Sequence, residues 1–347
     1  MKHYRKFTLL MLLALLLVSV TPLSAQDDTE CEDGFRSVEH FTGTTCIPEN
    51  PERVVAFDPG VIEMFAAFEF APVGSTALLE AFFVSTYVDV ADSLTNLTED
   101  LPDIGFPVNQ EVLLEIEPDL IIWGFGGSFQ PENINDIAPV VVIDSSLSWQ
   151  ENLLFVGDIL NKTAIAEALI ADYEMRVETL QELLEGQENL EVSIVLVSAQ
   201  EGAPYFIQLP GSFAHDILTD VGLQIPEAQY EFSDSGGIAI GMERLDLLDG
   251  DVILLFNASP DPEAYIELQE NLDILRADPL FNTLNAAQND QVYQGGPYWY
   301  VQSTIYGAHS ALDDLFTYIA GVDPQEVSPN PFRNYETDIE ATEEASD

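Results

Sequence analysis

Two stretches of the sequence, QEVLLEIEPDLIIWG at residues 110–124 and MERLDLLDGDVILLF at residues 242–256, follow the same pattern 132 positions apart. We call them the first repeat and the second repeat. When the two sequences are aligned, Glu111 matches Glu243 and Asp119 matches Asp251. Units of this kind are common in α/β proteins, so chance resemblance is the alternative. The more specific interpretation is that the chain contains two similar lobes.

Each repeat predicts a short helix followed by a buried strand. Leu113 and Ile116 lie three residues apart, as do Leu245 and Leu248, which is the spacing of one apolar helix face. A proline or a glycine then ends the helix in each repeat. The apolar run that follows shows no polar alternation, which is typical of a strand covered on both faces in a parallel sheet.

Strand and helix patterns alternate on both sides of one long uninterrupted helical pattern. Residues 163–185 contain no glycine or proline, and Gly186 follows as a C-terminal cap. At 1.5 Å per residue such a helix is about 35 Å long, enough to act as a strut. We expect an N-terminal α/β lobe at residues 51–160, a linker helix at 161–187 and a C-terminal α/β lobe at 188–322.

The N-terminus reads as a secretory signal peptide over residues 1–25. A basic start precedes the uncharged stretch from Phe7 to Val20, and small residues follow up to Ala25, where we expect cleavage. The uncharged stretch has 14 residues, whereas roughly 20 are needed to span a bilayer. An uncleaved anchor is the alternative. No cysteine follows Ala25 directly, so no lipid-anchored start is predicted, and we expect a periplasmic or cell-surface protein.

The ends of the mature chain have distinct compositions. Cys31 and Cys46 are the only two cysteines and lie in the segment 26–50. In an oxidising compartment they are predicted to form a disulfide, since two thiols alone are too few for a metal site. The acidic segment 323–347 is expected to be a disordered tail.

The mature chain is strongly acidic. The sequence has 61 Asp and Glu against ten Lys and Arg, and three of the ten lie in the signal, which leaves a net charge of −54. This charge excludes nucleic acid as a partner on electrostatic grounds. It indicates solubility or adaptation to salt.

Ligands of open α/β sheets gather beyond the carboxyl ends of the strands. Asp58 and Phe125 follow two of the predicted strands, in the contexts RVVAFD and DLIIWGF. Tyr298, Trp299 and Tyr300 lie in an expected loop before the last helix, and Tyr306 follows in that helix. Such an aromatic group predicts a binding surface, and core packing is the alternative.

Catalytic and metal-binding patterns are weak. His40, His215 and His309 are the three histidines beyond the signal, and each is interpreted as structural. The glycine-rich GFGGS lacks the nucleotide-binding fingerprint and the P-loop lysine, and no G-x-S-x-G elbow occurs. We predict no enzymatic activity, no cofactor and no resident metal. A zinc or manganese protein on a similar scaffold and a secreted adhesion module are the rival hypotheses.

Several stretches together carry a family resemblance. Between residues 31 and 321 the chain contains, in this order, PENPERVVAFDPGVIEMFAAF, the first repeat, the long helix, GSFAHDILTDVG, the second repeat and ALDDLFTYIAG. The chain resembles the periplasmic substrate-binding proteins of iron-siderophore ABC importers, a family that also includes vitamin B12 and haem binders. The resemblance implies two Rossmann-like lobes joined by a single long rigid α-helix, with the ligand between them and little hinge closure.

The resemblance also implies roles for particular residues. In this family a glutamate on each lobe docks onto arginines of the membrane permease, and the matching positions here are Glu111 and Glu243. The expected ligand-binding residues are Asp58, Phe125, Ser212, Phe213, Tyr298, Trp299 and Tyr300. We expect a monomer that partners an ABC permease dimer. The alternative to docking is that both glutamates only stabilise the N-terminus of their helix electrostatically.

The ligand is less well specified than the family. Many members hold anionic ferric siderophores with arginines, but this chain has only six arginines and one lysine beyond the signal. A neutral or cationic ferric chelate held by aromatic side chains is therefore the prediction. A corrinoid stays open, and haem is disfavoured because no histidine falls in the expected loops.

Overall fold

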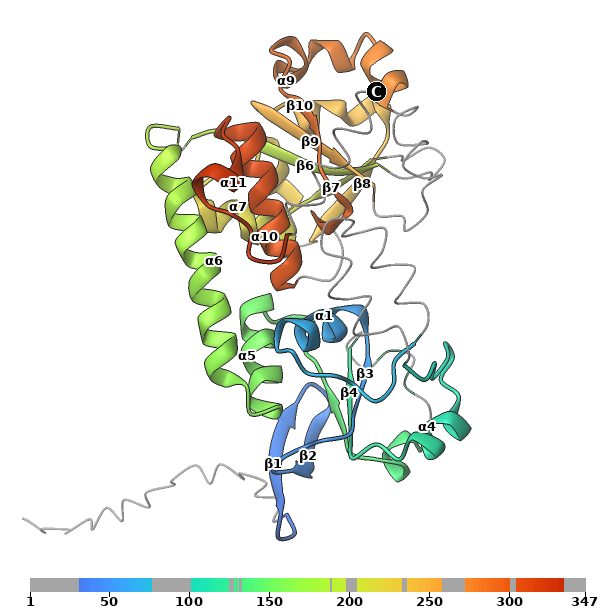
Figure 1. The fold of residues 1–347 in the computed structure, drawn as a ribbon. Coiled ribbons are helices and arrows are strands. Elements are labelled where there is room, and N and C mark those ends of the chain that lie inside the picture. The colour runs from blue at the N-terminus through green and yellow to red at the C-terminus, as the bar shows by residue number, and fades with distance from the viewer. Residues whose placement is uncertain are drawn as a thin grey trace, which may run out of the picture.

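A computed structural model of the chain shows two lobes, with one long helix running along one side of both (Figure 1). The described residues are 31–76, 101–124, 128, 130, 133–187, 189–197, 205–232, 236–257, 272–299 and 304–333. The predicted fold class, two α/β lobes joined by a long helix, is confirmed. Within these ranges no helix combines the length and the apolar character that crossing a membrane requires.

The N-terminal lobe, which we call the N-lobe, is built on a small parallel sheet. Its strands are hydrogen-bonded in the order β3 (Val54–Phe57), β4 (Leu120–Trp123) and β5 (Val140–Val142). Its helical elements are α1 (Pro59–Ala67), α4 (Gln110–Ile116), the 3₁₀ helix η2 (Ile134–Asp136) and α5 (Trp149–Ile159). Every residue of the three strands is buried, so both faces of the sheet are covered, as the unbroken apolar runs predict.

The C-lobe, from residue 188 onward, contains a five-stranded sheet in the order β10-β9-β6-β7-β8. These strands are β6 (Val192–Val197), β7 (Tyr205–Gln208), β8 (Gly237–Ile240), β9 (Val252–Phe256) and β10 (Val292–Gln294). The strands β10, β9 and β6 are parallel, whereas β7 and β8 pair antiparallel. Only seven residues join β6 to β7, fewer than the dozen or so that a parallel crossover needs.

Short helical elements surround the C-lobe sheet. They are α7 (Phe213–Val221), η3 (Glu227–Phe232), η4 (Met242–Leu248), η5 (Phe281–Thr283), α9 (Asn285–Gln288), η6 (Pro297–Trp299), α10 (Ile305–Asp314), the π-helical η7 (Leu315–Ile319) and α11 (Pro324–Val327).

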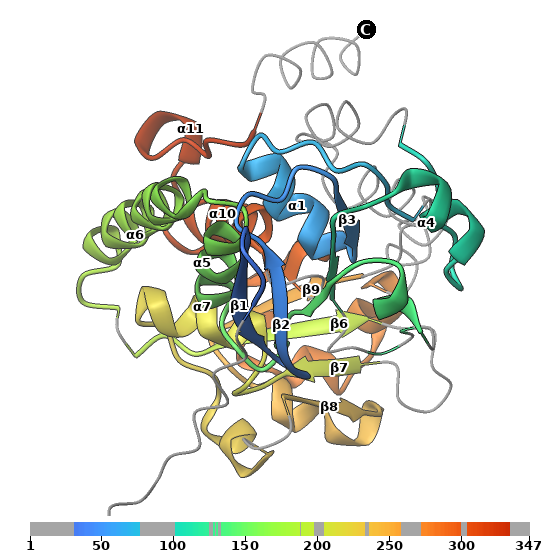
Figure 2. The same ribbon diagram turned by 90° about the horizontal axis from the view of Figure 1, so that it is seen from below.

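The long helix α6 (Thr163–Leu183) connects the lobes. It has 21 residues, which corresponds to a length of about 30 Å. It packs on α5 of the N-lobe and on α7 and α10 of the C-lobe, and Figure 2 shows α6, α5 and α10 on one side of the molecule and α4 on the other. The lobes also meet directly, because the Thr304 hydroxyl at the start of α10 donates to the Glu63 carboxylate of α1, and both side chains are fully buried.

Hydrophobic packing continues from one lobe into the other. One face of the N-lobe sheet, with Val54, Ala56 and Ile122, belongs to the same buried cluster as α1, α5, α6, α10 and the C-lobe sheet. The opposite face, with Phe57 and Trp123, forms a separate small core under α4 and η2. A shared core of this kind couples the lobes rigidly, because interiors are close-packed and resist sliding.

The two repeats form corresponding units in the two lobes. The first repeat is α4 followed by β4, and the second is η4 followed by β9. Strand β4 pairs in parallel with β3, the first strand of its lobe, and β9 pairs in parallel with β6, the first strand of the other lobe. The interpretation of two helix-to-strand units is therefore confirmed.

An antiparallel hairpin that the sequence did not reveal precedes the N-lobe. It consists of β1 (Phe35–His40) and β2 (Gly43–Pro48). The predicted disulfide Cys31–Cys46 is present, with the two Cα atoms 5.6 Å apart. At the tip of the hairpin the Phe41 N–H donates to the Val142 carbonyl at 3.1 Å, which attaches the hairpin to the edge strand β5.

The prediction that disorder begins at residue 323 is wrong for residues 323–333. The short helix α11 lies in this segment, and the Ser328 carbonyl accepts a hydrogen bond from Arg176 Nε at 3.0 Å. The Phe332 ring packs on Tyr306, with 4.2 Å between ring centroids. These anchors precede the acidic run that suggested disorder. Residues 334–347 and the predicted signal at residues 1–25 lie outside the described ranges.

Candidate functional site

Asp58 lies at the carboxyl edge of the N-lobe sheet, directly after β3. Its side chain is 8% exposed, and Oδ1 accepts a hydrogen bond from the Gly60 N–H at 2.7 Å, which caps α1. Gly124 follows β4, and a Cβ atom there would lie 2.3 Å from the Asp58 Cβ. The glycine therefore leaves the space that the Asp58 side chain occupies across the ends of both strands. Phe125, the next predicted ligand residue, lies outside the described residues.

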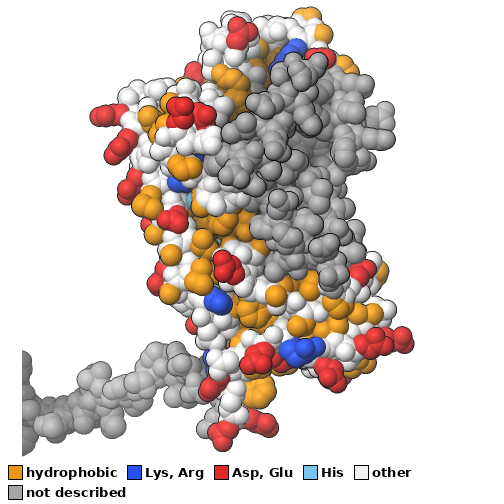
Figure 3. Space-filling model, in the orientation of Figure 1, with side chains coloured by type: hydrophobic (Ala, Val, Ile, Leu, Met, Phe, Trp, Pro, Cys, Tyr) orange, Lys and Arg blue, Asp and Glu red, His pale blue; other side chains and the backbone are white. Residues whose placement is uncertain are grey.

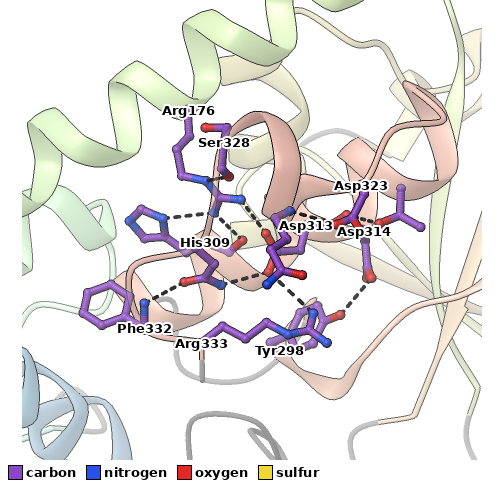
Figure 4. Close-up of polar contacts among 12 residues, drawn as sticks. Arg176, Tyr298, His309, Asp313, Asp314, Asp323, Ser328, Phe332 and Arg333 are labelled. Atoms are coloured by element: carbon purple, nitrogen blue, oxygen red, sulfur yellow. Dashed lines mark hydrogen bonds and ion pairs between the residues drawn. The ribbon is translucent and has the colours of Figure 1, made fainter. Parts of the chain in front are cut away.

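Tyr298 and Trp299 are held by one buried carboxylate, as Figure 4 shows for Tyr298. The Tyr298 hydroxyl donates to Asp314 Oδ1 at 2.8 Å, and Trp299 Nε1–H donates to Asp314 Oδ2 at 2.7 Å. Trp299 has no exposed surface, so core packing, the alternative to a binding surface, describes its indole here. Its contact with a ligand, and that of Tyr298, stay predictions. Tyr300 lies outside the described residues.

The backbone before these aromatic residues leaves room for their rings. A Cβ at Gly295 would lie 2.9 Å from the Trp299 ring, and a Cβ at Gly296 would lie 2.1 Å from the Tyr298 ring. Burial raises the pKa of Asp314 to about 7, although the hydrogen bonds from Trp299 and Tyr298 act in the opposite direction. The segment after β10 is thus fixed by a carboxyl group that titrates near neutral pH.

Ser212 and Phe213 lie apart from the aromatic segment. Ser212 caps α7, since its hydroxyl accepts from the His215 N–H at 3.2 Å, and Phe213 is buried. They follow β7, which runs antiparallel to β6, whereas Tyr298 follows the parallel strand β10. The strand directions therefore place the two groups at opposite edges of the C-lobe sheet, and ligand contact by Ser212 and Phe213 remains a prediction.

A buried polar cluster ties α6 to α10 and to the segment after it (Figure 4). Arg176 is 4% exposed, forms an ion pair with Asp313 and donates to the His309 carbonyl at 2.9 Å. The Asn330 amide also donates to Asp313, at 2.9 Å. Burial, followed by the nearby Arg176 charge, holds the pKa of His309 well below its usual value. His309 thus lies in a structural cluster.

The three histidines beyond the predicted signal lie on three different elements. His40 lies on β1 and contacts Thr45, His215 lies on α7, and His309 lies on α10. No group of three or more His, Cys, Asp or Glu side chains that could hold a metal ion occurs within the described residues.

Glu111 and Glu243 occupy the first turns of α4 and η4, and both are exposed. Asn109 caps α4 by accepting from the Glu111 N–H at 3.0 Å. The second helix differs from the first because η4 is a 3₁₀ helix that is kinked at Arg244. The structure places one exposed carboxylate at the start of each repeat, and its docking role stays a prediction.

The few cationic side chains are largely engaged. Asp and Glu side chains are scattered over both lobes on the face shown in Figure 3, where Lys and Arg are few. All seven Lys and Arg beyond the predicted signal lie in the described ranges. Within the described residues four of the arginines form ion pairs, namely Arg36–Asp158, Arg176–Asp313, Arg244–Asp246 and Arg333–Asp313. Arg53 donates to backbone carbonyls instead.

Three residues with clear contacts were missed by the sequence interpretation: Arg53, Gln229 and Asp314. The sequence pattern places Arg53 only at the start of the predicted strand RVVAF, and no motif singles out Gln229 or Asp314. The aligned Asp119 and Asp251 are the sequence signal that could have pointed to these contacts. Each accepts a backbone hydrogen bond beside the start of the first strand of its lobe.

Comparison with known proteins agrees with this architecture. Residues 88–298 match the family model described as "Periplasmic binding protein". The chain is 28% identical over 328 residues to the probable siderophore-binding lipoprotein YfiY of Bacillus subtilis, which covers 88% of this chain and 97% of that protein. It is 26% identical over 285 residues to the achromobactin-binding periplasmic protein of Dickeya dadantii, covering 78% and 88%.

Solved structures share the fold. SirA of Staphylococcus aureus in complex with staphyloferrin B superposes with a TM-score of 0.69 at 21% identity, covering 82% of this chain and 98% of SirA. The catecholate-siderophore binding protein VctP of Vibrio cholerae gives a TM-score of 0.62 at 18% identity, covering 81% and 99%.

Proposed function

Since the chain belongs to the periplasmic binding protein family, we propose that it is the extracytoplasmic substrate-binding component of an ABC importer. It captures a ferric siderophore between its two lobes and delivers the chelate to the permease, and it catalyses no reaction. The relatives named for siderophore binding support this ligand class. The observation that carries the proposal is the pair of matched repeats, each of which opens with an exposed glutamate.

Delivery relies on the two glutamates. Glu111 and Glu243 lie on separate lobes, and the lobes are coupled by α6 and by a shared core. Two carboxylates at a fixed separation match the two equivalent surfaces of a symmetric permease dimer, and charge complementarity sets the register. The protein acts as a monomer in this arrangement.

The charge of the protein favours a neutral or cationic chelate. The net charge beyond the signal is −54, and most of the few arginines are already paired with acids or carbonyls. A field of this sign lowers the local concentration of polyanionic catecholate or citrate complexes. A ferric hydroxamate such as cationic ferrioxamine B is the class that fits best.

Titration of tryptophan fluorescence tests the proposal. All three tryptophans are buried, so a ferric chelate bound in the interlobe region quenches them by energy transfer without direct contact. The panel consists of ferrioxamine B, ferric citrate, a ferric catecholate, haemin, cobalamin, zinc and manganese. We expect saturable quenching at low micromolar concentration by ferrioxamine B, and weaker quenching by the anionic chelates.

Other outcomes are equally informative. Saturation by haemin or cobalamin alone would contradict the ferric-siderophore ligand while leaving the family function in place. A response to zinc or manganese without any response to the chelates would contradict the proposed cargo.

A further inference from the structure

The carbonyl end of α4 is held by Arg53. Arg53 Nε donates to the Glu117 carbonyl at 2.9 Å, and Nη2 donates to the Ile116 carbonyl. These are the last carbonyls of the helix, which lack partners inside it. Glu117 closes the helix in a left-handed conformation, with φ of 50°. A planar guanidinium with a fixed fork of donors is suited to clamp two adjacent carbonyls.

The corresponding end of η4 is held from the inside by Gln229. Its amide Nε2 donates to the Leu247 carbonyl at 2.7 Å and to Ser193 Oγ at 2.8 Å. The Ser193 hydroxyl donates in turn to the Leu248 carbonyl at 3.3 Å. Both side chains are fully buried, so this clamp lies within the C-lobe core, whereas that of α4 lies on the surface.

Both clamps act beside the first strand of the lobe. Arg53 directly precedes β3, and Ser193 lies on β6. The repeats add a second tie: Asp119 Oδ2 accepts from the Glu52 N–H at 2.8 Å, and Asp251 Oδ2 accepts from the Glu191 N–H at 3.1 Å. Each short helix is thereby fixed to the sheet of its lobe at its carboxyl end.

The opposite end of each helix carries the exposed glutamate. Glu111 lies five residues before Ile116, which is about 7.5 Å along a helix axis. A helix of seven residues is too short to be stable by itself. Its direction therefore depends on its anchors, and loss of an anchor at one end displaces the carboxylate at the other.

We propose that Arg53 and Gln229 are positioning residues that set the geometry of the Glu111 and Glu243 carboxylates for permease docking. This inference rests on the proposed function. Arg53 acts on the N-lobe helix and Gln229 on the C-lobe helix, and neither residue contacts ligand or permease.

Hydrogen–deuterium exchange of the whole mature chain gives the first test, since it needs neither ligand nor permease. In Arg53→Ala the Glu117 N–H, which donates to the Leu113 carbonyl, is expected to exchange about tenfold faster. Arg36→Ala is the matched control, because it removes the same charge from an arginine of the same half whose side chain bonds to Asp158. Unchanged exchange in Arg53→Ala would overturn the positioning role.

Iron uptake gives the second test. Each variant replaces the wild-type protein in cells, and the cells receive radioactive iron bound to the chelate selected by the fluorescence titration. Arg53→Ala is expected to lower initial uptake about tenfold with unchanged chelate affinity, and Arg53→Lys to restore part of it. In the Glu111→Ala background Arg53→Ala is expected to cause no further loss of uptake while its effect on exchange persists. An additive loss would contradict action through Glu111.

The outcomes separate the two proposals. If Glu111→Ala lowers uptake and Arg53→Ala does not, the positioning role fails and docking stands. If Glu111→Ala has no effect on uptake, both fail. For the C-lobe, Gln229→Met keeps the shape of the buried side chain, and it is expected to lower uptake in the wild-type background but not in Glu243→Ala.

Discussion

The two repeats have nearly the same sequence pattern and yet differ in the helix that each forms. The first repeat makes a regular α-helix with an Asn109 cap and a left-handed end at Glu117, whereas the second makes a 3₁₀ helix kinked at Arg244. The strands that follow agree, since each is buried and pairs with the first strand of its lobe in the same register. The apolar run thus decides the strand, and local tertiary contacts decide the helix.

The contacts explain why the helices differ. The α4 helix lies over a small separate core and is held by the exposed Arg53, while η4 belongs to the large shared core and is held by the buried Gln229. The Asp119 N–H donates to the Arg53 carbonyl, and the Asp251 N–H donates to the Glu191 carbonyl. Glu191 therefore occupies in the C-lobe the backbone position that Arg53 occupies in the N-lobe. A glutamate cannot donate to carbonyls, so the C-lobe requires a different clamp.

Truncation of the matched leucines is the strongest way to break the comparison. Leu113 and Leu245 are 0% and 3% exposed, and replacing either by alanine is expected to lower the free energy of unfolding by about 2–5 kcal/mol. Denaturant unfolding measures both. If the smaller core under α4 rearranges more readily, Leu113→Ala lies at the low end of this range. A loss below about 1 kcal/mol at either site would contradict its place in the core.

The buried carboxyl of Asp314 makes the C-lobe sensitive to pH. Its pKa is raised from 3.8 to about 7, so between these values the folded state keeps a proton that the unfolded state has lost. Stability is therefore expected to fall as pH rises from 4 to 7, by an amount on the order of 3 kcal/mol from this group. In Asp314→Asn this fall should be smaller, and an unchanged pH dependence of the unfolding free energy would contradict the assignment.

The matched aspartates are expected to have smaller and unequal effects. Asp251 accepts from both the Glu191 N–H and the Asn285 amide, whereas Asp119 has the single such bond from the Glu52 N–H. Loss of a bond to a charged acceptor costs about 1–3 kcal/mol. Asp251→Ala should therefore destabilise more than Asp119→Ala in the same unfolding assay, and the reverse order would contradict this ranking.

Substitutions of the residues that end the two helices are expected to cost unequal amounts of stability. A Cβ at Gly250 would lie 2.8 Å from the Glu191 carbonyl oxygen, so Gly250→Ala should cost about 1–3 kcal/mol through overpacking. Pro118→Ala frees the unfolded chain and should cost less than about 1 kcal/mol. Equal losses of melting temperature would indicate that both turns tolerate a side chain alike.

Much of this architecture follows from local pattern. The buried strands, the long helix and the disulfide were predicted because their signals lie in contiguous sequence. The antiparallel direction of β7, the strand β8 and the packing of residues 323–333 were not, because they depend on connection length and on partners such as Arg176 that are distant in sequence.

The candidate site was predicted less completely than the fold. The exposed positions of Glu111 and Glu243 could be inferred from the repeats, since a helix start on a lobe surface is a local property. The inward orientation of Trp299 depends on Asp314, which is 15 residues away and carried no pattern of its own. Aromatic side chains alone do not reveal whether they face a ligand or a buried carboxylate.

Uptake of radioactive iron by cells that carry Glu111→Ala together with Glu243→Ala tests the main claim most directly. The proposed function predicts that uptake from the bound chelate falls to the level of cells without the protein, while the purified variant binds the chelate with unchanged affinity. Uptake at the wild-type rate would contradict delivery by twin carboxylates.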